Sequence, residues 1–349
     1  MKVGKISANV IQHSRHAISN KDMISLEIEI PRIILAELNT HKIMIRNSQS
    51  TRAVPIKDAI KQIEENMFMP KYWGKNQSGM VAKEECNSEI DPKSFPGHEN
   101  STYEYLITRE ATWKDSASSA IKYAMAYNNA GYHKQICGRL LEPFSMIKLV
   151  FTATEWDNFF NLRIHPDAEP HFRELAIKCY IAIKNSKPIV IKNGEWHLPY
   201  IDRIRDGNGV LRYYVNQKEI NLETARDISL SCIAQTSYRK HDTTEEKAET
   251  IISKLFGSDP VHASPAESVA TPMINPTGFI PFEGTLPFEC PQYWEDGVTH
   301  ITRDGNKWSG QLKHFIQYRQ LIPNNVCNEF THDKFIEYTM DLPMERIFE

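Results

Sequence analysis

The sequence predicts a fold that combines β-strands with α-helices, because three segments carry the periodicities of these elements. Residues 24–30 alternate between apolar and polar side chains, which is typical of a half-buried strand. Residues 56–67 place four apolar side chains on one helical stripe. Residues 206–209, Asp-Gly-Asn-Gly, separate two short runs of strand-forming residues and favour a β-hairpin.

The N-terminal elements follow in order from these patterns. The first strand is followed by Pro31, which suits the first position of a helix, and by Ile34 and Leu38 one helical turn apart. A polar segment over 40–52 comes next. The helix over 56–67 follows it and closes this part of the chain.

The middle of the chain alternates loops with regular elements. Residues 70–100 are rich in Pro, Gly, Asn, Lys and Glu and predict a long loop. We expect a helix over 101–129 and a strand over 146–152. A short helix capped by Thr154 and a longer helix over 169–185 should follow.

The C-terminal part has weaker signals. We interpret the hairpin as a surface elaboration and expect helices near Leu222 and over 244–256. A Pro-rich region over 260–291 precedes a helix or strand over 307–321. No fixed-period repeat is visible, which argues against a solenoid. These patterns fit one domain over 1–349 with insertions at about 70–100 and about 196–216.

Composition bounds the class of protein. The chain has 349 residues, of which 41% are hydrophobic and 24% charged, with a formal net charge of -3. These values describe a soluble globular protein and favour neither nucleic acid nor membrane as its partner. The N-terminus lacks an apolar leader, so we expect a cytoplasmic protein. The six cysteines form no Cys-x-x-Cys pair, which indicates reduced structural thiols.

The segment Thr40–Arg52 is the strongest candidate for ligand binding. Its two arginines, Arg46 and Arg52, can each offer a bidentate fork to a phosphate. Ser50 and Thr51 add hydroxyl donors, and His41 with Lys42 can serve a second anionic group. The alternative is a solvated basic loop that follows a helix.

A second polar block covers residues 158–173. It holds four possible metal ligands: His165, Asp167, Glu169 and His171. Two prolines break helical spacing and no His-Glu-x-x-His pattern is present, so we expect no metal site. The better interpretation assigns Arg163 and Arg173 to ligand binding.

Two further blocks gain meaning only in combination. Arg139 lies in Gly-Arg-Leu-Leu-Glu-Pro, where a lone arginine is more often a surface or ion-pair residue. Residues 234–238, Ala-Gln-Thr-Ser-Tyr, and residues 260–268 bring Ser237, His262, Ser264 and Glu267.

Together these blocks resemble the flavin-dependent thymidylate synthases, the family often called ThyX. The family signature reads Arg-His-Arg, two residues, Ser, one residue, Asn, two residues, Ser, one residue, Arg. The matching residues are His41, Asn47, Ser50 and Arg52, and the departures are Thr40, Lys42 and Ile45. Residues 161–173 are similar to the family's Leu-Arg to Ala-Gln to Ile-Arg run.

The order of the blocks resembles a circular permutation. The family carries its Ala-Arg-Val-Ser and His-x-Ser/Thr-Pro-Phe-Glu-His segments before the signature. The similar elements here, residues 234–237 and 262–267, come after it. Permutation is tolerated where termini lie close together at the surface. The block over 231–349 would then correspond in part to the family's N-terminal block.

The resemblance implies a mixed α/β (α+β) fold, with a sheet and flanking helices, and a homotetramer whose active sites lie between subunits. It also implies FAD, with NADPH and methylenetetrahydrofolate as co-substrates, and dUMP as the acceptor that becomes dTMP. The implied nucleotide-binding residues are Glu37, Ser50, Thr51, Arg52, Arg139 and Arg173, with Arg173, Ser50 and Arg52 as catalytic residues. The implied flavin-binding residues are His41, Lys42, Asn47, Asn161, Arg163, Asp167, Ser237, His262, Ser264 and Glu267.

Charge placement gives the expected mechanism. A fixed cation such as Arg173 can stabilise the enolate charge that makes C5 of uracil nucleophilic. No nucleophilic cysteine is needed. Ser50 is expected to contact the phosphate or the base and not to act as a covalent nucleophile. Two alternatives stay open: a related flavin- and folate-dependent enzyme for another pyrimidine deoxynucleotide, and an inactive nucleotide-binding homologue. A packed scaffold with structural arginine ion pairs is the remaining possibility.

Overall fold

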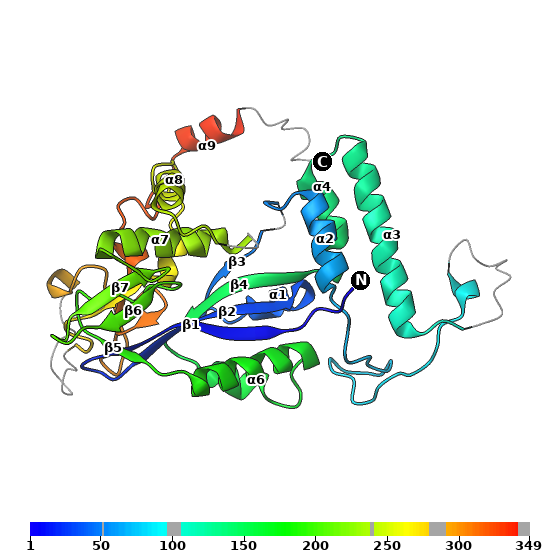
Figure 1. Ribbon diagram of the computed structural model, residues 1–349, viewed down its shortest axis with the longest axis horizontal. Coiled ribbons are helices and arrows are strands. Elements are labelled where there is room, and N and C mark those ends of the chain that lie inside the picture. Colours follow the sequence, from blue (N-terminus) through cyan, green and yellow to red (C-terminus); the bar gives the residue numbers. More distant parts are fainter. Residues whose placement is uncertain (51, 96–105, 238–240, 279–290, 341–349) are drawn as a thin grey trace.

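A mixed five-stranded sheet lies at the centre of the molecule. The computed structural model describes residues 1–50, 52–95, 106–237, 241–278 and 291–340. The strand order is β3-β4-β2-β1-β5 (Figure 1). Strand β5 pairs with β1 in parallel, and the other neighbours are antiparallel. The strands are β1 Ser7–His16, β2 Asp22–Pro31, β3 Ile45–Ser48, β4 Met146–Ala153 and β5 Ile189–Ile191.

One face of this sheet is covered by helix α6 (Pro170–Asn185), which lies below the sheet in Figure 1. Because alternate strand residues point to opposite faces, the even-numbered β2 residues and odd-numbered β4 residues face α6. This core is built from Ile24, Leu26, Ile28, Ile30, Leu149, Phe151, Phe172, Leu175, Ala176 and Cys179. The helix predicted over 169–185 is therefore confirmed, and its buried side faces the sheet.

A second core lies on the opposite side of the sheet. Helix α7 (Leu222–Ala234) packs against α8 (Glu245–Phe256), and both share a core with small sheets. The strands of these sheets are β6 Asp202–Arg205, β7 Leu211–Val215, β8 Lys218–Ile220, β9 Ala270–Pro272 and β13 Phe315–Gln317. This core contacts the central sheet through Met23, Ile45 and Val150.

A third cluster closes the end of the sheet where β4 begins. Helices α2 (Ile56–Asn66) and α3 (Arg109–Asn129) stand side by side there, with α4 (Lys134–Cys137) beside them (Figure 1). The 3-10 helix η3 (Gly138–Phe144) connects this cluster to β4.

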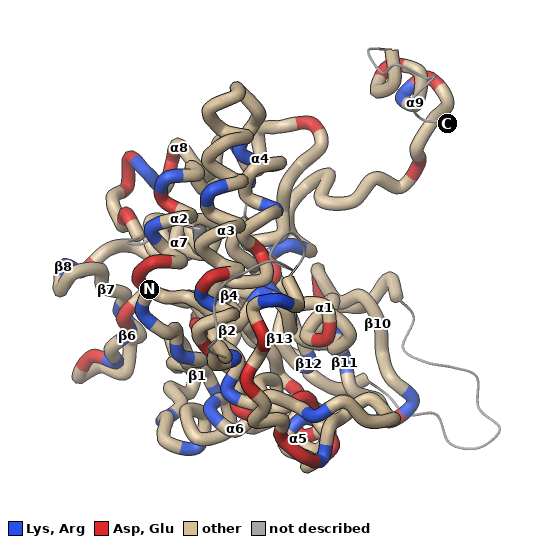
Figure 2. The backbone as a smooth tube through the Cα atoms, turned by 90° about the vertical axis from the view of Figure 1, so that its right-hand side faces the viewer, with Lys and Arg blue, Asp and Glu red and all other residues tan. Residues whose placement is uncertain are grey.

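The remaining elements are short. Helix α9 lies at the end of an extended segment, apart from the sheet, and basic and acidic residues are interspersed along the chain (Figure 2). No helix in the described ranges is both long enough and apolar enough to span a bilayer. These elements are α1 Leu35–Leu38, α5 Asp157–Arg163, α9 His332–Thr339, β10 His300–Ile301, β11 Lys307–Ser309 and β12 Leu312–Lys313.

Three predicted helix starts are wrong. Pro31, expected at the first position of a helix, is the last residue of β2, and the α-helix that follows begins at Leu35. The helix expected to begin near residue 101 begins at Arg109, with Thr108 as its cap; residues 101–105 lie outside the described ranges. The short helix expected at Thr154 begins at Asp157, with Trp156 at its N-cap position. Thr154 accepts a hydrogen bond from the backbone N–H of Lys313 at 3.0 Å, so its hydroxyl joins the C-terminal region to the sheet.

The hairpin is not the surface elaboration that the sequence predicts. Its residues Ile201, Leu211 and Tyr213 belong to the second core. Arg203 is only 6% exposed and donates to the hydroxyl of Ser14 on β1. The hairpin therefore packs directly onto the central sheet. The turn residues were interpreted correctly, but turn chemistry carries no information on what the flanking strands contact.

Candidate functional site

The Thr40–Arg52 segment forms a turn, the edge strand β3 and a second turn. Helix α1 ends at Leu38, and the hydroxyl of Thr40 donates to the carbonyl of Glu37 at 2.7 Å. The backbone N–H of Met44 donates to the carbonyl of His41 at 3.1 Å, which closes a tight loop. Strand β3 then pairs with β4, so the sheet holds the middle of the segment.

His41 is buried at the centre of this turn. Its ring lies edge-on to Phe159 and Phe172, with centroids 5.2 and 5.8 Å away. Burial, followed by the charges of Arg163 and Arg46, lowers the pKa of His41 to about 4. The ring is therefore neutral at pH 7. Its Nε2 accepts a hydrogen bond from Nε of Arg163 at 2.7 Å, which places the ring proton on Nδ1.

Arg163 connects the two polar blocks that the sequence singled out. Its guanidinium lies 4.5 Å from the ring centroid of Phe172 and donates to the hydroxyl of Thr40 at 3.3 Å. It also forms an ion pair with Glu37 at 3.8 Å. Burial and the charge of Glu169 raise the pKa of Glu37, although Arg163 opposes this shift.

Arg173 lies on the first turn of α6, beside this cluster. Its Nε donates to the carbonyl of Ile164 at 2.9 Å. Within the described ranges its two terminal nitrogens form no hydrogen bond or ion pair, so they remain available to a ligand. The N-cap residue Glu169 accepts from the N–H of Phe172 at 2.7 Å and from His171 at 2.6 Å, which fixes the start of the helix.

The C-terminal block meets the segment at β3. The side-chain amide of Asn47 donates to the carbonyl of Ser264 at 3.0 Å, although 217 positions separate them. Ser264 begins the 3-10 helix η5 (Ser264–Ser268). Glu267 in this helix forms an ion pair with Arg319, and Gln317 donates to the carbonyl of Glu267 at 3.0 Å.

Arg139 lies in a different pocket, of about 440 Å³. It shares the carboxylate of Glu142 with Arg32, at 2.9 and 3.1 Å. Asn39 also lines this pocket; it directly precedes the turn over residues 40–44, which we call the signature turn. Sequence reasoning missed Arg32. The available signal was its place directly after β2, at the start of the turn that leads into α1.

The structure thus brings together only part of the predicted set. The residues joined by direct contacts at the signature turn are Glu37, His41 and Arg163, with Arg173 beside them. Asn47, Ser264 and Glu267 form the second group. Ser50 is half-buried, and the exposed members are Lys42, Arg52, Asn161, Asp167 and His262. Thr51 and the side chain of Ser237 lie outside the described part of the chain.

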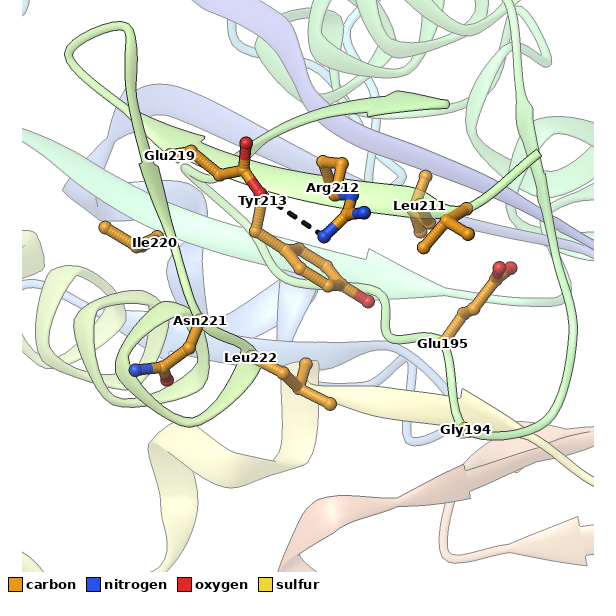
Figure 3. Close-up of a pocket in the computed structure, with 10 residues that line it drawn as sticks. Gly194, Glu195, Leu211, Arg212, Tyr213, Glu219, Ile220, Asn221 and Leu222 are labelled. Atoms are coloured by element: carbon orange, nitrogen blue, oxygen red, sulfur yellow. Dashed lines mark hydrogen bonds and ion pairs between the residues drawn. The ribbon is translucent and has the colours of Figure 1, made fainter. Parts of the chain in front are cut away.

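A larger pocket of about 600 Å³ lies beside the hairpin, at the start of α7 (Figure 3). Its charged side chains are all paired: Arg212 lies 3.5 Å from Glu219 in the pocket and 3.0 Å from Asp206 outside it. Glu195 is engaged by Arg205 at 2.9 Å. None of the predicted site residues lines this pocket, so the signature region remains the candidate site.

The sequence matches one family model, described as thymidylate synthase complementing protein, over residues 2–189. This span contains the signature segment, Arg139 and the block from Asn161 to Arg173. No curated protein matches the sequence significantly.

Proposed function

Because the chain belongs to the thymidylate synthase complementing protein family, we propose that it is a flavin-dependent thymidylate synthase. It would convert dUMP to dTMP with methylenetetrahydrofolate, FAD and NADPH. The observation that carries this proposal is the family match, which spans the segment where neutral His41 is held against Arg163.

The residues around β3 suit a flavin dinucleotide by their chemistry. A diphosphate needs cationic donors, and Lys42 and Arg163 supply them within or beside one turn. The amide of Asn47 and the backbone of Ser264 add neutral polar groups from the facing segment. When bound, the reduced flavin would supply the electrons of the reaction.

The protein's own contribution to the chemistry is charge placement. The open terminal nitrogens of Arg173 can donate to a uracil carbonyl oxygen and stabilise the negative charge that develops there. Glu37 can accept a hydrogen bond from a base N–H, because its raised pKa reflects a partly desolvated carboxylate. Phe159 and Phe172 exclude water from one side of the His41 ring.

The proposal includes a homotetramer and a permuted order of elements. In one chain Arg139 lines a pocket with Arg32 rather than with Arg173, which supports a site completed by a second subunit. The contact between Asn47 and Ser264 supports the C-terminal block as the counterpart of the family's N-terminal block. Analytical ultracentrifugation should give a tetramer, and a monomer would reject that part of the proposal.

A second candidate function is modification of another pyrimidine deoxynucleotide. The specific observation is Thr40, which stands where the signature has arginine and accepts a hydrogen bond from Arg163 instead of offering a cation. A pocket changed at this position can select a different base or one-carbon product.

Purified protein tests these functions in two steps. A preparation with flavin absorbance near ~450 nm is expected. Protein that stays colourless after reconstitution with FAD would reject both enzymes and favour an inactive nucleotide-binding homologue. Mass analysis of products from dUMP and dCMP then separates the two candidates, since thymidylate is expected only from the first.

A variant tests the assigned chemistry. Arg173→Ala should reduce dUMP binding and turnover while FAD remains bound, because only the nucleotide loses a cation. Arg212→Ala, at the distant hairpin, is the matched control. Normal turnover in Arg173→Ala would remove this residue from its proposed role.

A further inference from the structure

Arg46 on β3 is a partly buried cation that has only part of its hydrogen-bonding capacity in use. One terminal nitrogen donates to the carbonyl of His41 at 2.6 Å and approaches that of Leu38 at 3.4 Å. Among the residues that the structure describes, none accepts a hydrogen bond from the Nε or the other terminal nitrogen of Arg46. None of them forms an ion pair with Arg46 either. The N–H bonds of these two nitrogens point in parallel from one edge of the guanidinium. This geometry allows a bidentate contact with a phosphate.

The neighbouring carboxylate is held away from Arg46. Glu267 is close enough to attract the guanidinium, and this attraction opposes the lowering of the Arg46 pKa by burial. Glu267 is bonded instead to Arg319, whose guanidinium also reaches the carbonyl of Asn325 at 3.4 Å. Two arginines therefore compete for one carboxylate, and Arg46 is the one left without it.

The position of Arg46 compensates for what the signature lacks. Thr40 is neutral, and the Lys42 side chain is exposed to solvent. Arg46 places a guanidinium beside the same turn, because it donates a hydrogen bond to the carbonyl of His41. The cation comes from the strand after the turn, on the side that faces Glu267.

We propose that Arg46 binds a phosphate group of a ligand held between the signature turn and the η5 segment. This inference rests on the proposed function, whose phosphorylated ligands include a nucleotide monophosphate and the diphosphate of FAD. Both present the same chemistry to a guanidinium fork, and binding measurements distinguish them.

The test compares Arg46→Met with the wild type by calorimetric titration of the full-length protein. The probes are dUMP with deoxyuridine, and FAD with riboflavin. We expect the variant to lose at least about tenfold in affinity for the phosphorylated member of one pair, since a charge-assisted fork is lost. Affinity for the unphosphorylated member should stay within about twofold. The pair that responds identifies the phosphate.

Three results would overturn or redirect the inference. Unchanged affinity for both phosphorylated ligands rejects it. An equal loss for deoxyuridine or riboflavin also rejects it, because it shows a packing role. If the wild type binds none of the four probes, the proposed function is rejected, and this inference is rejected with it. Arg212→Met, at a remote and partly exposed arginine, is the matched control.

A second variant leaves Arg46 in place, which guards against misfolding of Arg46→Met. Arg319→Met releases Glu267 to pair with Arg46, so the same phosphorylated ligand should bind more weakly. Arg46→Lys keeps the charge without the fork and should give an intermediate affinity. Wild-type affinity in both of these variants would contradict the inference.

Discussion

The two faces of the central sheet are built from different chemistry. The face toward α6 is made of aliphatic and aromatic side chains, with Leu26, Ile28 and Phe151 fully buried. On the opposite face, Gln12, Ser14, Ser25 and Thr152 are buried although they are polar, and Glu27, Glu29 and Lys148 are half-buried.

A hydrogen-bond network lies beside the apolar contacts of Met23, Ile45 and Val150 on the second face. His197 is fully buried and bonds to Ser14 at 2.7 Å and to Ser25 at 2.8 Å. Ser25 bonds in turn to Thr152 at 2.7 Å. Arg203 donates to Ser14 at 2.9 Å and to the side-chain oxygen of Gln12 at 2.7 Å. The comparison shows that the first face gains its stability mainly from apolar burial, whereas the polar network of the second face depends on the protonation state of His197.

Acidification should break the second face first and give the largest effect. Burial lowers the pKa of His197 well below 6.5 and that of His314 to about 4. Each ring must stay neutral in the folded state, while the unfolded chain takes up a proton below pH 6.5. Their contribution is therefore complete above pH 6.5 and is lost as pH falls toward 4.

Urea denaturation between about pH 7.5 and about pH 4.5 measures this loss. The free energy of unfolding should fall steadily below about pH 6.5. Constant stability over this range would contradict the assignment of neutral buried histidines.

Phe151→Ala should give the next largest effect, on the apolar face. The ring is fully buried against Trp156 and Phe159, with centroids 5.4 and 5.6 Å away. Its removal leaves a cavity and should cost about 3–5 kcal/mol of unfolding free energy. Denaturation at neutral pH measures this, and Ile204→Ala, at a side chain 58% exposed, is the control. A loss below about 1 kcal/mol would mean that this core can collapse around the site.

His197→Leu should cost about 2 kcal/mol at neutral pH, because Ser14 and Ser25 each lose one partner but keep another. The variant should also lose less stability on acidification than the wild type. This pairing of effects separates a titrating group from a merely packed one. An unchanged pH profile would assign the acid sensitivity to other histidines. His300→Leu, at an exposed ring, should leave both quantities unchanged.

Tyr200→Phe should give the smallest effect. Its hydroxyl donates to Glu27 at 3.0 Å at the partly exposed margin of the polar face. Loss of one such bond should cost about 1 kcal/mol. A cost above about 3 kcal/mol would show that the margin is as tightly coupled as the buried network.

The same contrast explains what the sequence could predict. Strand β2 and helix α6 were found because their core faces are apolar and therefore periodic. Strand β1 was missed, since it buries Gln12, His13, Ser14 and His16 instead of aliphatic residues. Hydrophobic periodicity cannot detect a strand whose core face is polar.

The candidate site shows a similar limit. Residue types and spacing located His41 and Arg163, and the structure joins them by a direct bond. Arg32 escaped notice because its significance depends on Glu142, which is distant in sequence. The partner of Asn47 is a backbone carbonyl, and no side-chain pattern marks such a group.

The bond between Asn47 and Ser264 also bears on how the protein is made. Translation proceeds from the N-terminus, so all five strands of the sheet leave the ribosome before η5 and Arg319 are synthesised. Strand β3 lies at the edge of the sheet and pairs only with β4, so until then the side chain of Asn47 has no η5 carbonyl to contact. The nascent chain can therefore complete its sheet early, whereas the proposed ligand site is complete only after Ser264 and Arg319 have been synthesised.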